Sequence, residues 1–261
     1  MKYCIAIPSL IDDECISDAV SSYVKNIIEP NVTDEIQFII HVDNFQYSDS
    51  VGTLESTIKL YEQLSDYVKC DVYCDGTRLG LKKSYQFLMK KFLESDCDYL
   101  MFYDDDHEII NPMPLSNDFV KTCLADLKYL IHFANAYLQA SSEFPFLTND
   151  SVYADDQIII RKNSNFFYTQ PGTIIPRYVV DKIFDDYCSH HVFSSERIVG
   201  NLMQKYFNFE ILTVCVNSGT DCLKVDGSEF SIPLEDHFSV DGRRFIKAGG
   251  YSNKSVFLFD G

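Results

Sequence analysis

Three consecutive aspartates, Asp104, Asp105 and Asp106, are the residues of this chain whose type and spacing most directly suggest chemistry. They follow residues 99–103, an apolar, aromatic-rich run that is too short for a helix and typical of a buried strand. Because neighbouring carboxylates repel one another and lose hydration on burial, we expect the aspartates at the exposed end of that strand.

Asp104 and Asp106 are two residues apart, so at a fraying strand end both can turn toward one hard cation or a ribose hydroxyl. Mg²⁺ and Mn²⁺ prefer carboxylate oxygens and accept substrate phosphates as further ligands. The run therefore predicts a site for a metal and a diphosphate. The alternative is an acidic turn that only keeps a strand end soluble.

Alternating strands and helices lead up to the aspartates and determine where they lie. We expect strands at 3–10, 36–42, 70–74 and 99–103, with helices at 12–28, 54–68 and about 82–93 between them. This alternation predicts a parallel α/β sheet with helices on both faces. Ligands bind such sheets beyond the carboxyl ends of the strands. Pro8-Ser9, Asp43, Arg78 and the three aspartates all fall at these ends or in the loops just after them.

Beyond Pro112 and Pro114 the pattern becomes mixed and rich in loops. Helices are expected at 117–127, 177–187 and from Ser194 or Ser195 to 206, with strands at 209–216 and, more weakly, 228–232 and 255–259. A hairpin is expected from 157–161 and 165–170, and 129–138 fits either a strand or a helix. We therefore divide one continuous domain into residues 1–112 and 113–261.

The composition excludes some classes of protein. The 261 residues carry a net charge of −17, which disfavours broad non-specific binding to nucleic acid or anionic membranes. Local basic patches remain at Lys82, Lys83, Lys90 and Lys91 and at Arg243, Arg244, Lys247 and Lys254. No apolar run approaches the length of a membrane span, and the N-terminus reads as a strand rather than a signal peptide. Nine scattered cysteines favour reduced thiols in a cytoplasmic protein of a bacterium or virus.

The first half resembles the GT-A glycosyltransferases, closest in pattern to the family 2-like enzymes that use nucleotide-sugars. The resemblance depends on four features: the strand ending at Ile7-Pro8-Ser9, Asp43, the loop Arg78-Leu79-Gly80-Leu81, and the strand followed by the DXD motif. It covers about residues 1–112 and continues more weakly to about residue 207. It implies metal-dependent transfer of a sugar from a nucleotide-diphosphate donor to an acceptor hydroxyl, with a UDP-sugar as the preferred donor. Mn²⁺ or Mg²⁺ is the implied metal.

The resemblance also implies residue roles. Pro8, Ser9 and Asp43 would line the nucleoside pocket, and Gly80 would let the loop backbone approach the nucleotide. Asp104 would meet the ribose or a metal-bound water, Asp105 would lie with it at the donor site, and Asp106 would bind the metal. A C-terminal histidine on the metal is common in GT-A enzymes, and His237 is its counterpart here.

Three departures from the family pattern change these expectations. Arg78 stands where the family commonly has Asn, and Ser84-Tyr85-Gln86 replaces its Ala-Arg-Asn triplet. The phosphate-facing arginine is thus missing, and Lys82 or Lys83 is its replacement. The family's later Glu-Asp pair has no clean match, and Ser195-Glu196 and Asp155-Asp156 are both candidates for it. We expect Glu196 as the general base and Asp156 as the second choice.

Other functions remain open at this point. Phosphatases of the haloacid-dehalogenase type also have a strand followed by a DXD motif. They require Thr or Val two residues after the second aspartate, and this chain has Glu108 there. A nucleotidyltransferase or a non-catalytic acidic binding protein are further alternatives. For a glycosyltransferase the acceptor is a glycan, a protein or a hydroxymethylated DNA base. Residues 231–252, with several cations and glycines, are expected to close over the donor.

Overall fold

The structure is a computed structural model. It describes residues 1–105, 107–133, 137–139, 147–163, 172–190 and 195–216, together with short strands at 225–226, 229–230, 237–240, 243–247 and 252–254.

The first half is a parallel α/β unit, as the sequence predicts. Its strands are β1 (Tyr3–Ser9), β2 (Ile36–Val42), β3 (Lys69–Tyr73) and β4 (Tyr99–Phe102), and its helices are α1 (Asp13–Tyr23), α2 (Leu54–Glu62) and α3 (Leu81–Glu94). The strands lie in the order β3-β2-β1-β4 and all run in one direction. All four carboxyl ends therefore meet at one edge of the sheet, which we call the carboxyl edge.

The second half continues the same sheet. Its helices are α4 (Asp118–Ala125), α5 (Arg177–Ser189) and α6 (Ser195–Tyr206). Its strands are β6 (Tyr129–Phe133), β8 (Leu147–Ala154), β9 (Ile158–Asn163), β10 (Thr173–Pro176) and β11 (Glu210–Val216), and the full nine-stranded order is β3-β2-β1-β4-β10-β6-β11-β9-β8. Because β10 is antiparallel to both β4 and β6, and β11 is parallel to β6, the strands β6 and β11 also end at the carboxyl edge.

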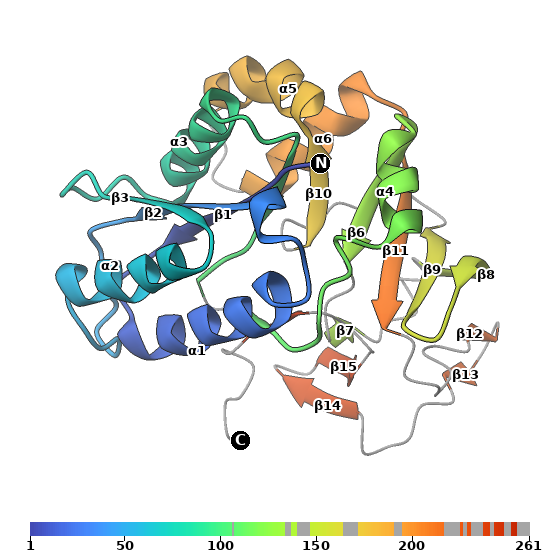
Figure 1. The fold of residues 1–261 in the computed structure, drawn as a ribbon, viewed down its shortest axis with the longest axis horizontal. Coiled ribbons are helices and arrows are strands. Elements are labelled where there is room, and N and C mark those ends of the chain that lie inside the picture. The colour runs from blue at the N-terminus through green and yellow to red at the C-terminus, as the bar shows by residue number, and fades with distance from the viewer. Residues whose placement is uncertain are drawn as a thin grey trace.

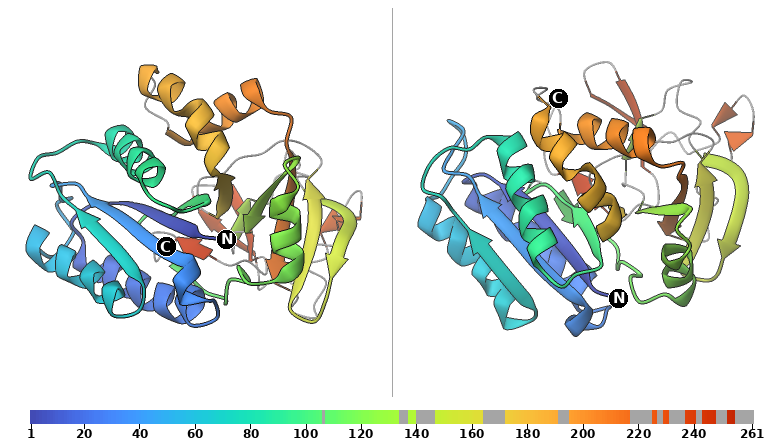
Figure 2. Two further views of the ribbon diagram at one scale, coloured as in Figure 1. Left: turned by 45° about the horizontal axis from the view of Figure 1, so that its top comes forward. Right: turned by 90° about the horizontal axis from the view of Figure 1, so that it is seen from above.

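Helices cover both faces of the sheet (Figure 1), with α3 and α5 above it and α1 and α2 below it in that view. Because successive side chains of a strand point to opposite faces of the sheet, they pack into two separate hydrophobic cores, one on each face. On β1, Ile5 and Ile7 pack toward α1 and α2, whereas Cys4 and Ala6 pack toward α3 and α5. The turned views show the same three layers (Figure 2).

A π-helical turn, Val24–Ile28, continues α1 where the sequence predicts an uninterrupted helix to residue 28. In this turn the side chain of Asn26 donates a hydrogen bond to the carbonyl of Ile109, and its own carbonyl accepts one from Met113 N at 2.7 Å. Just beyond it, Asn31 Nδ2 donates to Met113 O at 2.8 Å. The turn therefore fixes the segment that follows the aspartates.

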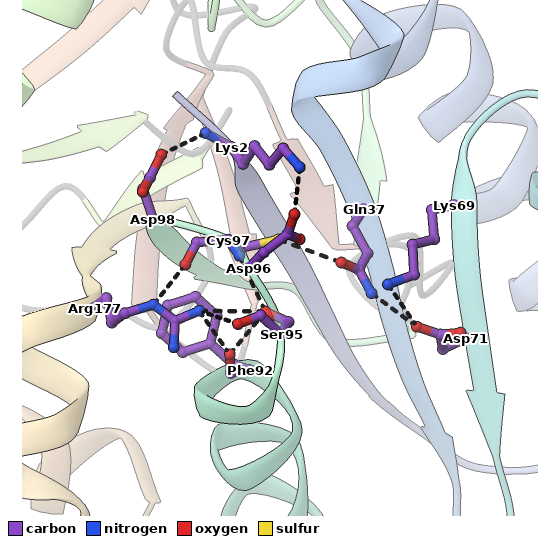
Figure 3. A network of polar contacts seen from close by, with 10 residues as sticks. All are labelled: Lys2, Gln37, Lys69, Asp71, Phe92, Ser95, Asp96, Cys97, Asp98 and Arg177. Atoms are coloured by element: carbon purple, nitrogen blue, oxygen red, sulfur yellow. Dashed lines mark hydrogen bonds and ion pairs between the residues drawn. The ribbon is translucent and has the colours of Figure 1, made fainter.

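The opposite, amino edge of the sheet holds a polar network around Arg177 (Figure 3). The guanidinium of Arg177 donates to the main-chain oxygens of Leu93, Ser95 and Cys97 at 2.8–2.9 Å and to that of Phe92 at 3.1 Å. These carbonyls lie at the C-terminal end of α3, where helix carbonyls lack helical partners and a cation is favourable. Arg177 thus joins the start of α5 to the end of α3.

Short strands flank the main sheet. β5 (His107–Ile109) pairs with β16 (Ser252–Lys254), with Lys254 opposite His107. β7 (Tyr137–Gln139), β14 (His237–Val240) and β15 (Arg243–Lys247) form a three-stranded sheet, and β12 (Val225–Asp226) pairs with β13 (Glu229–Phe230). A segment near the C-terminus therefore lies directly beside the strand that follows the aspartates.

Some expectations for the second half need correction. The predicted hairpin partner of 157–161 was 165–170, but β9 pairs with β8 across the turn at 155–157, because residues 147–154 already supply an adjacent strand. Residues 129–133, ambiguous in the sequence, form β6. Residues 165–170 and 255–259 lie outside the described residues. Within the described part of the chain, no helix has the length and apolar character needed to cross a membrane.

Candidate functional site

The first part of the site is the junction between the ends of β1 and β2. Ser9, the last residue of β1, accepts a hydrogen bond at its carbonyl from Asp43 N at 2.8 Å. Its hydroxyl accepts one from Tyr61 Oη at 3.0 Å and donates to Leu10 O at 3.0 Å. Pro8 precedes it within buried β1, paired with His41 of β2. Ser9 is therefore held in place by α2 and by the following loop.

Asp43 organises the loop that leads into α3. Its side chain is buried, with the residue 2 % exposed, and its two oxygens accept hydrogen bonds from Leu79 N and Gly80 N, each at 2.7 Å. Gly80 has φ +79°, a conformation that glycine adopts without strain, and no described residue other than its chain neighbours comes within 4 Å of the position that a Cβ would occupy there. The backbone at the start of α3 thus has a fixed shape, and the described part of the chain leaves that side uncovered.

Cations surround this loop. Arg78 is exposed, and its guanidinium carbon lies 3.7 Å from the centre of the Phe45 ring. Lys82 is half-buried in the first turn of α3, and Lys83 beside it is exposed. A helix N-terminus and nearby lysines together favour an anion such as a phosphate.

Asp104 lies where β4 ends, with its carboxylate between two side chains. Tyr85 Oη of α3 donates to Asp104 Oδ1 at 2.6 Å, and His107 Nδ1 lies 3.9 Å from Oδ2. The main-chain oxygen of Asp104 accepts hydrogen bonds from His107 N at 3.1 Å and from Tyr23 Oη at 3.4 Å. The carboxylate remains 28 % exposed, so one of its oxygens can still reach a ligand.

Asp105 turns toward the loop after β1. Its Oδ2 accepts a hydrogen bond from Leu10 N at 2.6 Å. This contact brings the end of β4 against the end of β1, so Ser9 and Asp104 belong to one continuous surface at the carboxyl edge. Asp106 lies outside the described residues.

Burial changes the acid–base behaviour of groups near this edge. Burial lowers the pKa of His41, and Asp75, whose carboxylate lies 3.8 Å from His41 Nε2, opposes that shift. Burial also raises the pKa of Tyr23 well above its usual range. Both groups are therefore uncharged at neutral pH, and the charges described at the site are those of its carboxylates, Arg78 and the lysines.

The donor set suits a hard divalent cation only in combination with a substrate. Among the described residues, no group of three or more histidines, cysteines or carboxylates is arranged to hold a metal. Asp104 offers a carboxylate oxygen. Mg²⁺ and similar ions in nucleotide-dependent enzymes are bound through one or two carboxylates together with phosphate oxygens and water. The residues present fit that mode of binding.

The remaining predicted residues lie on the second half. Asp156 is exposed in the turn between β8 and β9. Its strand β9 is four positions from β4 in the sheet, about 19 Å at the usual strand spacing. Glu196 lies in the first turn of α6, and His237 begins β14.

Sequence reasoning missed two residues that fix the site. Tyr85 falls on the apolar face of the helix expected at about 82–93 and departs from the Ala-Arg-Asn triplet, and Tyr61 falls at an apolar position of the helix expected at 54–68. Each contacts its partner through the hydroxyl, across 19 residues for Tyr85 and 52 for Tyr61. The helical periodicity that marks both as buried gives no signal for such a contact.

The fold defines the class: the chain has the GT-A glycosyltransferase fold, as the sequence resemblance implied. No family model and no curated protein sequence matches it.

Among solved structures, the chain is similar to S. aureus TarS, a GT-A-type glycosyltransferase. The TarS 1-349 structure in complex with UDP matches with a TM-score of 0.54 and 13% identity, over 82% of this chain and 57% of that one. The TarS 1-349 complex with UDP-GlcNAc matches with a TM-score of 0.51 and 15% identity, over 82% and 56%. This chain thus spans a little over half the length of those chains.

Proposed function

We propose that this protein is a metal-dependent glycosyltransferase that moves a sugar from a nucleotide-diphosphate donor, a UDP-sugar first, to an acceptor hydroxyl. The observation that carries the proposal is the ordered carboxyl edge. There Asp43 shapes the glycine loop before α3 and Asp104 ends β4 within a GT-A fold. The UDP and UDP-GlcNAc complexes of TarS support the choice of donor.

In this proposal Asp104 and Asp106 hold Mn²⁺ or Mg²⁺, which neutralises the diphosphate as it leaves. Pro8, Ser9 and Asp43 line the nucleoside pocket, and Gly80 lets the backbone approach the nucleotide. Arg78 and Lys82 add positive charge, and Asp105 keeps the β1 loop against the β4 end. Residues 1–112 form the donor half and 113–261 the acceptor half of one domain, which the continuous nine-stranded sheet supports.

The C-terminal region completes the donor site. The pairing of β16 with β5 supports this role, since Lys254 lies opposite His107, three residues after Asp104. Residues 231–252 close over the donor and exclude water, and His237 joins the metal. A basic segment beside an acidic motif fits a ligand of diphosphate and metal, which carries both signs of charge.

Glu196 is the proposed general base, which takes the proton from the acceptor hydroxyl. The chain passes from α6 at Tyr206 into the amino end of β11 at Glu210, so Glu196 lies at the far end of α6, about 15 Å back along the helix. Asp156, four strands from Asp104, is the less favourable choice.

The acceptor is a glycan, a protein or a hydroxymethylated DNA base. A cytoplasmic location is supported by the free thiols of the described chain, Cys4 and Cys70 among them.

A thermal-shift screen tests the donor. Nucleoside diphosphates and nucleotide-sugars are added with and without Mn²⁺ to the protein and to the Asp104→Asn and Asp106→Asn variants. We expect UDP or a UDP-sugar to raise the Tm only with the metal, because a ligand that binds the folded state stabilises it. Both variants should lose the shift, while Asp49→Asn, an exposed carboxylate in a loop of the same edge, should keep it. A metal-independent shift, or no shift with any nucleotide, contradicts the proposal.

A second measurement separates donor binding from catalysis. Glu196→Gln should lower the rate of UDP-sugar turnover by about 10²-fold, the usual scale for loss of a general base, and leave Mn²⁺–UDP affinity unchanged. If Asp156→Asn has this profile and Glu196→Gln does not, the base is Asp156.

A further inference from the structure

Tyr85 is buried between α3 and the end of β4. It is 1 % exposed, and its ring packs edge-on against Phe102 with 4.7 Å between the ring centres. Phe102 is the last residue of β4, two residues before Asp104. The ring is thus fixed by the strand whose end carries the carboxylate.

The hydroxyl of Tyr85 reaches one particular atom of the site. It donates to Asp104 Oδ1 at 2.6 Å, a short distance that is typical of a hydroxyl bound to a charged carboxylate. The other oxygen, Oδ2, lies 3.9 Å from His107 Nδ1, beyond hydrogen-bond distance. The two carboxylate oxygens therefore have different environments: Oδ1 accepts the hydrogen bond of Tyr85, and Oδ2 lies near His107 without a hydrogen bond to it.

The same helix is fixed at its start by the other carboxylate of the edge. Asp43 binds Leu79 N and Gly80 N, and α3 begins at Leu81. Tyr85 follows Gly80 by five residues, little more than one helical turn. A short stretch of α3 thus connects the end of β2 to the end of β4.

We propose that Tyr85 is a positioning residue for Asp104, which orients its carboxylate so that Oδ2 is the oxygen presented to the metal ion. This inference rests on the proposed function and deepens it. Because the hydroxyl is committed to Asp104 Oδ1, its role is to fix the geometry of that carboxylate. The position is the one at which the Ala-Arg-Asn triplet of similar enzymes has arginine.

The test compares Mn²⁺ binding at saturating UDP, by calorimetry, for the wild type and Tyr85→Phe. This change removes one oxygen and keeps the ring, so packing against Phe102 persists. Loss of a group that orients a metal ligand costs about 10- to 100-fold in metal affinity, and we expect a loss in that range. The matched control is Tyr3→Phe. Tyr3 is an equally buried tyrosine whose hydroxyl donates to Leu115 O at 3.2 Å and which lies at the start of β1, away from the carboxyl edge.

Urea unfolding of the two single variants distinguishes positioning from general support of the fold. If Tyr85 acts through Asp104, Tyr85→Phe should lower Mn²⁺ affinity, whereas Tyr3→Phe should leave Mn²⁺ affinity unchanged at a similar loss of stability. Equal Mn²⁺ affinity in the wild type and Tyr85→Phe overturns the inference and leaves the proposed function intact. Absence of Mn²⁺-dependent UDP binding in the wild type overturns the proposed function and the inference with it.

Discussion

Asp43→Asn tests how the loop before α3 is organised. In the wild type both carboxylate oxygens accept main-chain N–H groups at 2.7 Å, and the side chain is almost fully buried. Asparagine keeps one acceptor oxygen and turns an NH₂ group toward the second N–H donor. The substitution therefore removes one charge-assisted hydrogen bond, weakens the other and leaves a buried donor unsatisfied.

The magnitude follows from those contacts. A hydrogen bond to a charged group contributes about 1.5–3 kcal/mol, and an unsatisfied buried polar group costs about 1–3 kcal/mol. Because the loop can relax, we expect the free energy of unfolding to fall by about 2–4 kcal/mol. That is a large part of the roughly 5–15 kcal/mol typical of a folded domain.

Urea unfolding followed by circular dichroism measures this loss, with Asp49→Asn as the control. Calorimetry of Mn²⁺–UDP binding is done in parallel at a temperature where the variant is folded. We expect affinity to fall together with stability, since the loop that approaches the nucleotide changes shape. A loss of stability below about 0.5 kcal/mol refutes the argument from burial and hydrogen bonding. Weakened UDP binding with unchanged stability assigns Asp43 to direct contact with the nucleotide instead.

Two further predictions concern residues to which the proposed function gives no part in donor binding. His132 is buried in β6, and burial lowers its pKa to about 4 from an ordinary value near 6.5. Below pH 6.5 this histidine takes up a proton more readily in the unfolded chain than in the folded one, so the stability present above pH 6.5 is lost as the pH falls to 4. Over that range the free energy of unfolding of the wild type, measured in urea titrations, should fall by about 3 kcal/mol more than that of His132→Asn. Arg177→Met removes the donors to four carbonyls at the end of α3 and should destabilise the protein by about 2–4 kcal/mol, with Mn²⁺–UDP affinity retained. Lys182→Met, an exposed lysine on the same helix, is its control and should change stability by less than about 0.5 kcal/mol.

The first half of the fold followed from local pattern because each of its elements is long and periodic. Strand ends could be located from Ser9, Asp43 and Asp104, since apolar runs stop there and polar residues begin. The parallel arrangement then brings those ends together at one edge. The second half was less predictable, because β10 inserts between β4 and β6 in reverse direction and β8 pairs with β9 through an irregular register. Periodicity contains no information on which strands become neighbours.

The site was predictable in its carboxylates and not in the groups that hold them. Asp104 and Asp43 are polar residues at the ends of apolar runs, a signal that the sequence carries openly. Tyr85 and Tyr61 are marked by the sequence only as buried helix positions, and their hydroxyls matter through contacts across long stretches of chain. Glu196, Asp156 and Asp106 stay predictions that the experiments above test, and His237 as a metal ligand stays a prediction.

The π-helical turn at Val24–Ile28 restricts how this protein can change length in evolution or by design. A π turn contains one residue more than an α-helical turn, so removing one residue there would restore the regular repeat and remove the bulge in which Asn26 lies. The hydrogen bonds of Asn26 with Ile109 and Met113 would then be lost, and the segment after the aspartates would lose its anchor. We therefore expect single-residue deletions to be tolerated in the exposed loop at 46–49 and rejected at 24–28, although both segments lie far from the aspartates in sequence.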